Sequence, residues 1–369
     1  MKPEQRDGGP LEETLTSVEV DAHPESRVHN SQLHGIGRVV ALDGLCAWNN
    51  LGRNVVFAGE DFRPRAVFDE SVFSEDEPSQ YDLDVHAILD IPSVGIVATL
   101  NHLGMLRAFS AGSVRRPGPL RRVAPLWTRT FAPDVERAVV LGDRVVGSRP
   151  REEGAPGLIV TERLSMKDEP GPLKMRVQLE MLGMVTALAA FRDGAAECVA
   201  LGGSGQVSLA PATTDGVGPL RWSINVNFET KVVLWDGALV WAAGSERVAN
   251  AIGDDDWEAL HGGGFAALDP IDGRVVVTGR FSEDLAWGNG GVALALVPGA
   301  LCGVGRRGQV CAFDTRDGTP LITSADIADE SLGIAHTAAL DNRVLYGFNR
   351  GGYRLHAIRV AAILGRAGS

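Results

Sequence analysis

The sequence predicts an all-β protein, a seven-bladed β-propeller built from four-stranded antiparallel blades, and two observations predict it. A unit of three short apolar strands, separated by a small turn and a Gly-bearing turn, recurs about every 50 residues along the chain. The 45 glycines and 19 prolines supply the many tight turns that such repeats need. The turns between first and second strands lie at Asp43, Asp90, Asp143, Asp193, Asp236, Pro298 and Asp341.

Two columns of β-branched, small apolar and aromatic residues mark the second and third strands of each unit. Gly, Asn or Asp residues bound the apolar run in both columns, as is typical of strand ends. The second strands are expected at LCAWN (45–49), GIVATL (95–100), RVVGS (144–148), ECVALG (197–202), ALVWAAG (238–244), LCGVG (301–305) and RVLYGF (343–348). The third strands are expected at NVVFAG (54–59), MLRAFS (105–110), LIVTER (158–163), QVSLAP (206–211), FAALD (265–269), QVCAFD (309–314) and YRLHAI (353–358).

A fourth strand follows in six of the units, and the last unit lacks one before the chain ends. A propeller blade is commonly completed by strands from both termini, which removes exposed sheet edges. We expect residues 34–40 or the segment IRVAAIL (358–364) to close the ring. Residues 1–33 are polar, acidic and without periodicity, which predicts a flexible N-terminal tail before a single propeller over residues 34–369.

Two segments with the same turn pattern carry a family resemblance. FAALDPIDGRVV (265–276) and QVCAFDTRDGTPL (309–321) resemble the quinoprotein-type, or PQQ-like, propeller repeat, in which Ala-x-Asp-x-x-x-Gly turns between the third and fourth strands. The chain is also similar to WD40-like propellers, through Trp235 and Asp236. This resemblance implies the repeat fold. No cofactor is expected, because the chain lacks the vicinal cysteine pair of several quinone-dependent dehydrogenases.

Charge and hydropathy restrict the classes of partner. The formal net charge is −12 and the pI about 5.2, which argues against binding nucleic acid or an anionic membrane. No apolar run reaches the roughly 20 residues that cross a bilayer, and the N-terminus has no signal-peptide core. We therefore expect a cytoplasmic protein. The high Ala, Arg and Gly content suggests a GC-rich genome, and we expect a bacterial protein.

The acidic turns and the cysteines raise the question of a metal. Asp-x-x-Asp-Gly occurs at 269–273 and 314–318, but the loop is too short for an EF-hand, and Asp-Gly is a common turn dipeptide. Four cysteines lie in apolar strand segments, which predicts buried, reduced thiols. Cys302 and Cys311 flank one hairpin turn symmetrically, so they could lie opposite each other on paired strands, where a disulfide or a metal is an alternative with no third ligand to support it. No metal site is expected.

The longest departure from the repeat is SERVANAIGDDDWEALH (245–261), here called the insertion. Long loops in compact folds are commonly binding elements, and Trp257 beside carboxylates suits a partner's basic surface, the channel mouth or an anchor on its own blade. The loop GRRG (305–308) lies on the same predicted face. We expect a protein partner to contact Asp254, Asp255, Asp256 and Trp257 of the insertion and Arg306 and Arg307 of the second loop.

Counting back from the repeat turns places five potentially cationic residues near the start of the channel-lining strands. Cations focused in a cleft of an acidic protein would hold an anionic small molecule. The alternative is that they pair with neighbouring carboxylates such as Asp84, Glu136 and Glu229. The five residues are Arg38, His86, Arg137, Lys231 and His336.

The chain has no Gly-x-Ser-x-Gly elbow, Walker loop or His-Glu-x-x-His motif, so the sequence assigns no catalytic residue. The first hypothesis is a non-catalytic propeller scaffold that binds a protein partner through its loop-rich face. The alternative is a metabolite-binding protein or enzyme that uses the partly cationic channel for an anionic small molecule. The sequence leans away from an enzyme and leaves the choice open.

Overall fold

The computed structural model consists almost entirely of β-strands, which confirms the all-β prediction. Its helical elements in the described residues are the short helix α1 (Ala111–Arg115) and a 3-10 turn at Pro92–Val94. The structure describes residues 15–19, 36–50, 54–59, 64–69, 85–101, 103–131, 135, 137–148, 158–167, 173–179, 185–203, 205–245, 263–281, 293–304, 309–326, 335–340, 343–348 and 354–359.

The strands form separate sheets in chain order, and consecutive strands of a sheet pair antiparallel. Each sheet is named below by its innermost strand. The β2 sheet holds β2 (Ile36–Leu42), β3 (Leu45–Asn50), β4 (Asn54–Ala58), β5 (Pro64–Asp69) and, on its outer edge, β9 (Arg121–Arg122), which pairs parallel to β5. The β6 sheet holds β6 (Val85–Ile91), β7 (Ile96–Asn101), β8 (Met105–Ser110) and β10 (Trp127–Thr130). The β11 sheet holds β11 (Arg137–Leu141), β12 (Arg144–Ser148), β13 (Leu158–Thr161) and β14 (Met175–Leu179).

The next sheets follow the same plan, with one extra strand. The β15 sheet holds β15 (Val185–Asp193), β16 (Ala196–Gly203), β17 (Gln206–Thr213), β18 (Gly216–Val217) and β19 (Trp222–Asn225), the last two both pairing with β17. The β20 sheet holds β20 (Glu229–Trp235), β21 (Val240–Ser245), β22 (Gly264–Leu268) and β23 (Val275–Arg280). The β24 sheet holds β24 (Ala293–Val297), β25 (Ala300–Val304), β26 (Gln309–Asp314) and β27 (Pro320–Asp326).

The β28 sheet combines strands from both ends of the chain. It holds β28 (Ala335–Leu340), β29 (Arg343–Phe348), β30 (Arg354–Arg359) and, on the outside, β1 (Leu15–Glu19). Leu15 lies opposite Ile358 and Glu19 opposite Arg354. β1 falls within residues 1–33 and outside both segments considered for closure from the sequence, because a five-residue strand among Glu, Pro and Gly leaves no periodic signal.

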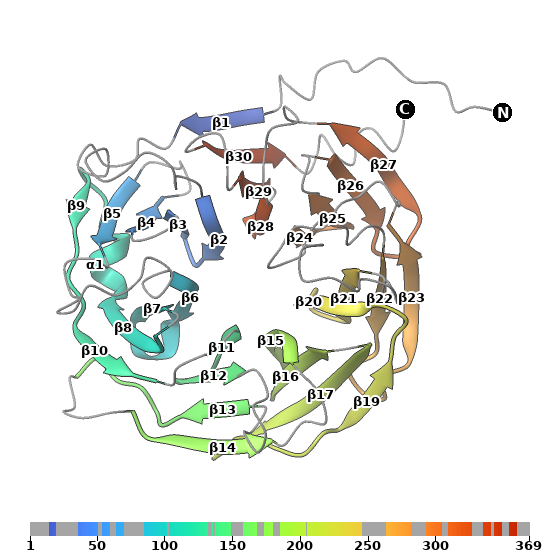
Figure 1. Ribbon diagram of the computed structural model, residues 1–369, viewed down its shortest axis with the longest axis horizontal. Helices are drawn as coiled ribbons and strands as arrows, with labels where there is room; N and C mark the ends of the chain where they lie inside the picture. The colour runs from blue at the N-terminus through green and yellow to red at the C-terminus, as the bar shows by residue number, and fades with distance from the viewer. Residues whose placement is uncertain are drawn as a thin grey trace, which may run out of the picture.

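The sheets stand around a common centre (Figure 1). Contacts between innermost strands run from β2 to β6, β11, β15, β20, β24 and β28, and from β28 back to β2. The first and last of these strands are therefore neighbours, and the ring closes on itself. The outermost strands, such as β14, β23 and β27, lie on the perimeter (Figure 1).

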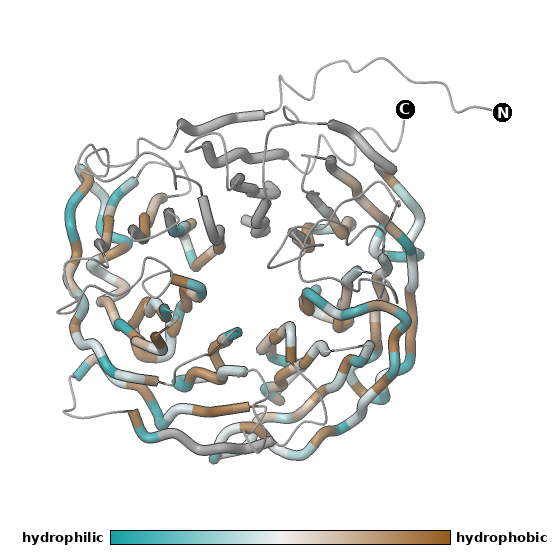
Figure 2. Tube along the Cα trace, in the orientation of Figure 1, coloured by the Kyte–Doolittle hydropathy of each residue, from teal (hydrophilic) through white to brown (hydrophobic). Residues whose placement is uncertain are grey.

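Hydrophobic cores lie between neighbouring sheets rather than at one centre. Along β7, Ile96, Ala98 and Leu100 pack with residues of the β11 sheet, whereas Val97 faces the β2 sheet. This period of two is that of a strand buried on both faces. Figure 2 accordingly shows hydrophobic positions in all the coloured sheets. Each fully buried Val, Leu or Ile contributes about 1.5–3 kcal/mol, so the described sheets from β2 to β24 are stabilised by the neighbours they pack against.

Candidate functional site

Several innermost strands carry a β-bulge near their first residues. The pairing with the second strand shifts register at His86 in β6, at Thr186 in β15 and at Lys231 in β20. In β2 the shift lies between Ile36 and Val39 and includes Arg38. A bulge leaves one residue outside the ladder and redirects its side chain. Three of the five channel candidates predicted from the sequence therefore occupy the same irregular position of the repeat.

Side-chain hydrogen bonds connect neighbouring sheets at this level of the ring. Asn49 Nδ2 donates to the carbonyl oxygen of Val85 at 2.7 Å, which joins the β2 and β6 sheets. Arg137 Nε donates to the carbonyl oxygen of Thr186 at 2.9 Å, and the Thr186 hydroxyl donates to the carbonyl oxygen of Thr230. These bonds satisfy backbone carbonyls next to the bulges, that of the bulged Thr186 among them, and they fix neighbouring sheets to one another.

Two of the candidate cations are engaged by other groups of the protein. Lys231 Nζ lies 2.5 Å from Glu229 Oε1, and both side chains are about a quarter exposed. This is the pairing with Glu229 considered from the sequence. Arg137 is half-buried and uses Nε to hold the β15 sheet. The charge of Lys231 is thus neutralised by Glu229, and Arg137 links the β11 and β15 sheets.

For the other three candidates, the structure describes the side chain of His86 but not those of Arg38 and His336. His86 is buried, with 4% of its surface exposed, so it does not lie on an open surface. Arg38 and His336 lie in β2 and β28, and their side chains fall outside the described part of the structure. The loop candidates also fall outside it: Asp254, Asp255, Asp256, Trp257, Arg306 and Arg307.

The two ends of the insertion meet at closely packed glycines. β21 ends at Ser245, which pairs with Glu229, so the insertion leaves the ring at the level of the bulges. A Cβ on Gly244 would lie 1.7 Å from the carbonyl oxygen of Glu229. On Gly263, whose φ is +125°, it would lie 2.0 Å from the carbonyl oxygen of Gly244. The backbones approach so closely that these positions require glycine; the sequence shows the glycines but not this contact.

Comparison with known proteins assigns the architecture. No protein-family model matches the chain, and no curated protein matches it in sequence. The β-propeller domain of Cps50 (Swd1) from Myceliophteria thermophila aligns with a TM-score of 0.60 and 10% identity, over 90% of this chain and 98% of that chain. BamB from Moraxella catarrhalis aligns with a TM-score of 0.51 and 15% identity, over 94% and 85%.

The fold is a β-propeller.

The computationally designed Ika8 protein is a further structural neighbour of this propeller, with a TM-score of 0.53, 13% identity and coverage of 88% of this chain and 83% of that chain. These neighbours confirm the propeller fold that the predicted resemblance implies. Identities of 10–15% carry the fold and no residue role.

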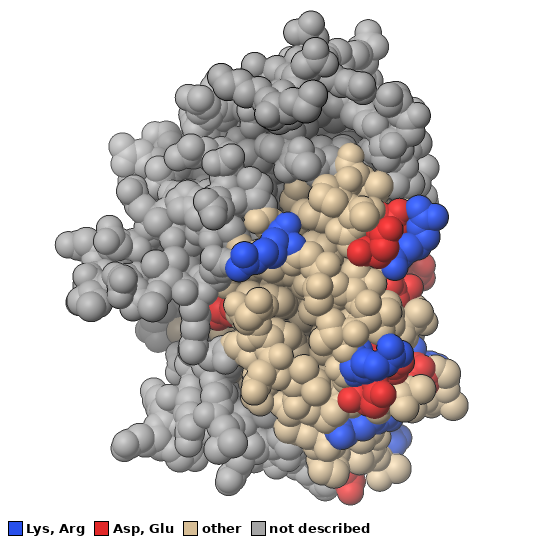
Figure 3. All heavy atoms as spheres, turned by 90° about the vertical axis from the view of Figure 1, so that its right-hand side faces the viewer, with Lys and Arg blue, Asp and Glu red and all other residues tan. Residues whose placement is uncertain are grey.

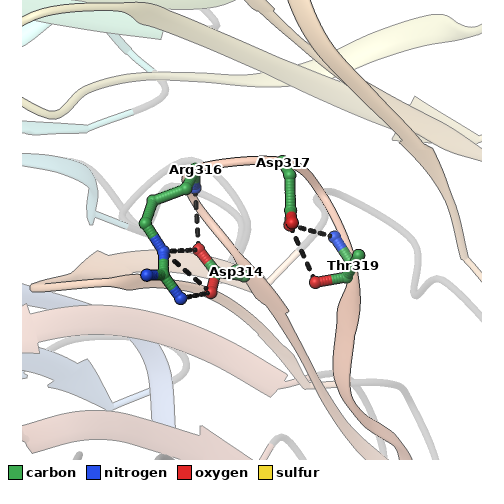
Figure 4. Close-up of polar contacts among 4 residues, drawn as sticks. All are labelled: Asp314, Arg316, Asp317 and Thr319. Carbon is green, nitrogen blue, oxygen red and sulfur yellow. Dashed lines mark hydrogen bonds and ion pairs between the residues drawn. The ribbon is translucent and has the colours of Figure 1, made fainter.

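The carboxylates of the acidic turns accept hydrogen bonds from backbone N–H groups of the same turns. Asp314 Oδ1 accepts from the backbone N–H of Arg316 at 2.8 Å, and Asp317 Oδ1 accepts from that of Thr319 at 2.9 Å (Figure 4). The Arg316 guanidinium, 2.5 Å from Asp314 Oδ2, and the backbone hydrogen bond lower the pKa of Asp314 to about 2. Asp269 makes the equivalent bond to the N–H of Ile271. These contacts favour a turn over a calcium loop.

The cysteines are free and buried. Cys302 and Cys311 do lie on paired strands, β25 and β26, but Cys302 opposes Ala312 and Cys311 opposes Gly303. The opposed pairing considered from the sequence is thus wrong by one residue, so their side chains leave opposite faces of the sheet. Burial raises the pKa of both thiols to about 12, which keeps them protonated at neutral pH.

Two further observations concern metals and membranes. Within the ranges that the structure describes, no three His, Cys, Asp or Glu side chains are grouped closely enough to hold a metal ion. Nor does any helix of those ranges have the length and hydropathy needed to span a bilayer.

Proposed function

We propose that this chain is a non-catalytic, seven-bladed propeller scaffold, its blades the seven sheets of the described strands, that binds a protein partner through the face where the insertion leaves the ring. The observation that carries the proposal is the insertion itself. The connection from β3 to β4 spans residues 51–53 and that from β16 to β17 spans 204–205, whereas β21 and β22 are separated by residues 246–263. One hairpin is thus strongly elaborated on a regular scaffold.

The glycine contacts support a binding role for the insertion. Gly244 and Gly263 bring its two ends together beside the start of β20, so its base has one defined position at the level of the bulges. A connection that only tolerated extra residues would not need this close approach. Presenting a binding segment from a fixed base reduces the conformational entropy lost on binding.

The described channel residues give less support to an anionic ligand. Lys231 is paired with Glu229, and Arg137 donates to a backbone carbonyl. An anion would have to displace a carboxylate that lies 2.5 Å from the lysine. We therefore propose the partner-binding role for Asp254, Asp255, Asp256, Trp257, Arg306 and Arg307.

The test is native mass spectrometry of the protein purified gently from its own host. Wild type should carry the additional mass of a protein subunit. A variant in which residues 247–261 are replaced by Gly-Ser, leaving both glycine contacts intact, should show the mass of its own chain alone. Trp257→Ala should reduce the fraction of the chain that carries the subunit.

A matched control shortens another connection of the same face. Replacing residues 149–157, between β12 and β13, by Gly-Ser should leave the subunit bound, and thermal unfolding should show that both shortened variants remain folded. Retention of the subunit by the 247–261 variant would refute the proposal. So would a small excess mass on wild type that denaturation removes, because that outcome indicates a channel ligand.

A further inference from the structure

A second surface lies on the connection between β8 and β10, which leaves its own sheet. Residues 111–126, here called the arginine strap, contain α1 and β9 (Arg121–Arg122). β9 pairs in parallel with β5 of the neighbouring β2 sheet, with Ala66 opposite Arg121 (Figure 1). The N–H of Val123 donates to Val67 at 2.9 Å, and the N–H of Leu126 returns to Ala108 at 2.6 Å. The strap is thus held at both ends on two sheets.

The arginine strap is basic in an acidic protein. It contains Arg115, Arg116, Arg121 and Arg122, and residues 91–133 include no Asp or Glu, although the net charge of the chain is −12. Arg115 is neutralised by Asp90, whose Oδ2 lies 2.5 Å from Nη2. Arg121 donates to the carbonyl oxygens of Ser113 and Arg116, which carry no net charge. Arg116 is exposed. Among the described contacts, no carboxylate pairs with Arg116 or Arg121, so a local positive charge remains on these two arginines.

Large apolar side chains are exposed beside these cations. Leu120 is 42% exposed and Leu126 is 40% exposed. Trp127, next to Leu126, donates its indole N–H to the carbonyl oxygen of Ser165 at 3.0 Å, and the following residue, Met166, is 48% exposed. Arginine with large apolar side chains is the composition enriched where proteins bind one another.

Protection of the sheet edge accounts for only part of the strap. β9 covers the outer edge of β5, and the prolines and arginines beside it discourage pairing with another chain. That task needs polar side chains, and exposing Leu120 and Leu126 works against it. A binding role accounts for the leucines and the arginines together.

We propose that the arginine strap binds an acidic segment of a partner protein that also carries apolar side chains. Charge complementarity selects this occupant: the local charge matches a few carboxylates, whereas the net charge of −12 repels an extended polyanion. The apolar side chains of the segment cover Leu120 and Leu126. The strap comes from a different connection than the insertion, so the two proposals are independent.

The test measures binding of a fluorescein-labelled peptide of alternating Glu and Leu to the full chain by fluorescence anisotropy. Wild type should bind it, and raising the salt from 50 to 200 mM should weaken binding. The double variant Arg116→Glu, Leu120→Ser should lose at least about tenfold in affinity for the peptide. A peptide with Gln for Glu and one with Ser for Leu should each lose affinity.

The matched control makes the same changes across the ring. Arg274→Glu with Ile271→Ser alters an exposed arginine and an exposed apolar residue of the β20 sheet, and should leave peptide binding unchanged. A peptide of alternating Lys and Leu should bind Arg116→Glu, Arg122→Glu better than wild type, which shows that the altered strap is folded. No peptide binding to wild type, equal losses in the two double variants, or binding only of an oligonucleotide or of anionic vesicles would overturn the proposal.

Discussion

The outer edges of the β2 sheet and the β20 sheet are protected in different ways. The edge strand β5 is covered by β9 of the arginine strap, and Val114 of the same strap is fully buried between the β2 and β6 sheets. β23 is the outermost strand of its sheet and leaves Val275 and Val276 exposed. On that side of the molecule, basic and acidic side chains lie next to one another (Figure 3). The outer edge of the β2 sheet is thus protected by an additional strand, and the outer edge of the β20 sheet, here called the charged rim, by charged side chains.

The largest effect is expected where the strap enters the core. Val114→Asp buries a carboxylate among the apolar residues between the β2 and β6 sheets, and should lower the free energy of unfolding by about 3 kcal/mol or more. Val276→Asp, on the exposed rim, should change it by less than about 0.5 kcal/mol. Urea denaturation of the two variants measures the difference. Equal losses would mean that the two edges are anchored alike.

A smaller effect is expected at the acidic turn beside the charged rim. The pKa of Asp314 is about 2 in the fold against 3.8 unperturbed, so its ionised form stabilises the fold above pH 4, and this contribution is lost as the pH falls from about 4 to 2. Asp314→Asn should cost about 1–2 kcal/mol at pH 7. The difference in Tm from wild type should shrink over that pH interval. A difference independent of pH would refute the ionic contribution.

The smallest effects compare one arginine on each rim. Arg121→Ala removes two hydrogen bonds within the strap and should cost about 1 kcal/mol. Arg274→Ala removes an exposed ion pair with Asp269, 3.8 Å long, and should cost less than about 0.5 kcal/mol. Limited proteolysis should cut the strap faster in Arg121→Ala alone. Unchanged cleavage would show that β9 pairing is sufficient to hold the strap.

Sequence reasoning recovered the parts of the fold that depend on local patterns. LCAWN and QVSLAP lie in β3 and β17, because short runs rich in apolar residues between turn residues specify strands. β1 and β9 were missed, because two to five residues among Pro, Glu and Arg give no period, and their pairing depends on distant partners. The offset of Cys302 and Cys311 depends on the hairpin register, which symmetry of spacing does not fix.

The sequence predicted where several candidate residues lie in the repeat, but not which groups they contact. Counting five residues back from the turns reached Lys231 and came within one position of His86, because these two bulges lie five and four residues before Asp236 and Asp90. The hydrogen bond from Arg137 to the carbonyl oxygen of Thr186 could not be predicted from the sequence. It depends on a bulge in the neighbouring β15 sheet. The glycine contact at the base of the insertion likewise requires three-dimensional coordinates.

The pairing of β1 with β30 has a consequence for how the protein is made. Residues 15–19 leave the ribosome before β2, and residues 354–359 leave it only after β29. β1 can therefore pair with β30 only after the strands of the other described sheets have been synthesised. Its contribution to the β28 sheet comes late in folding, because domains and sheets form as their partners emerge.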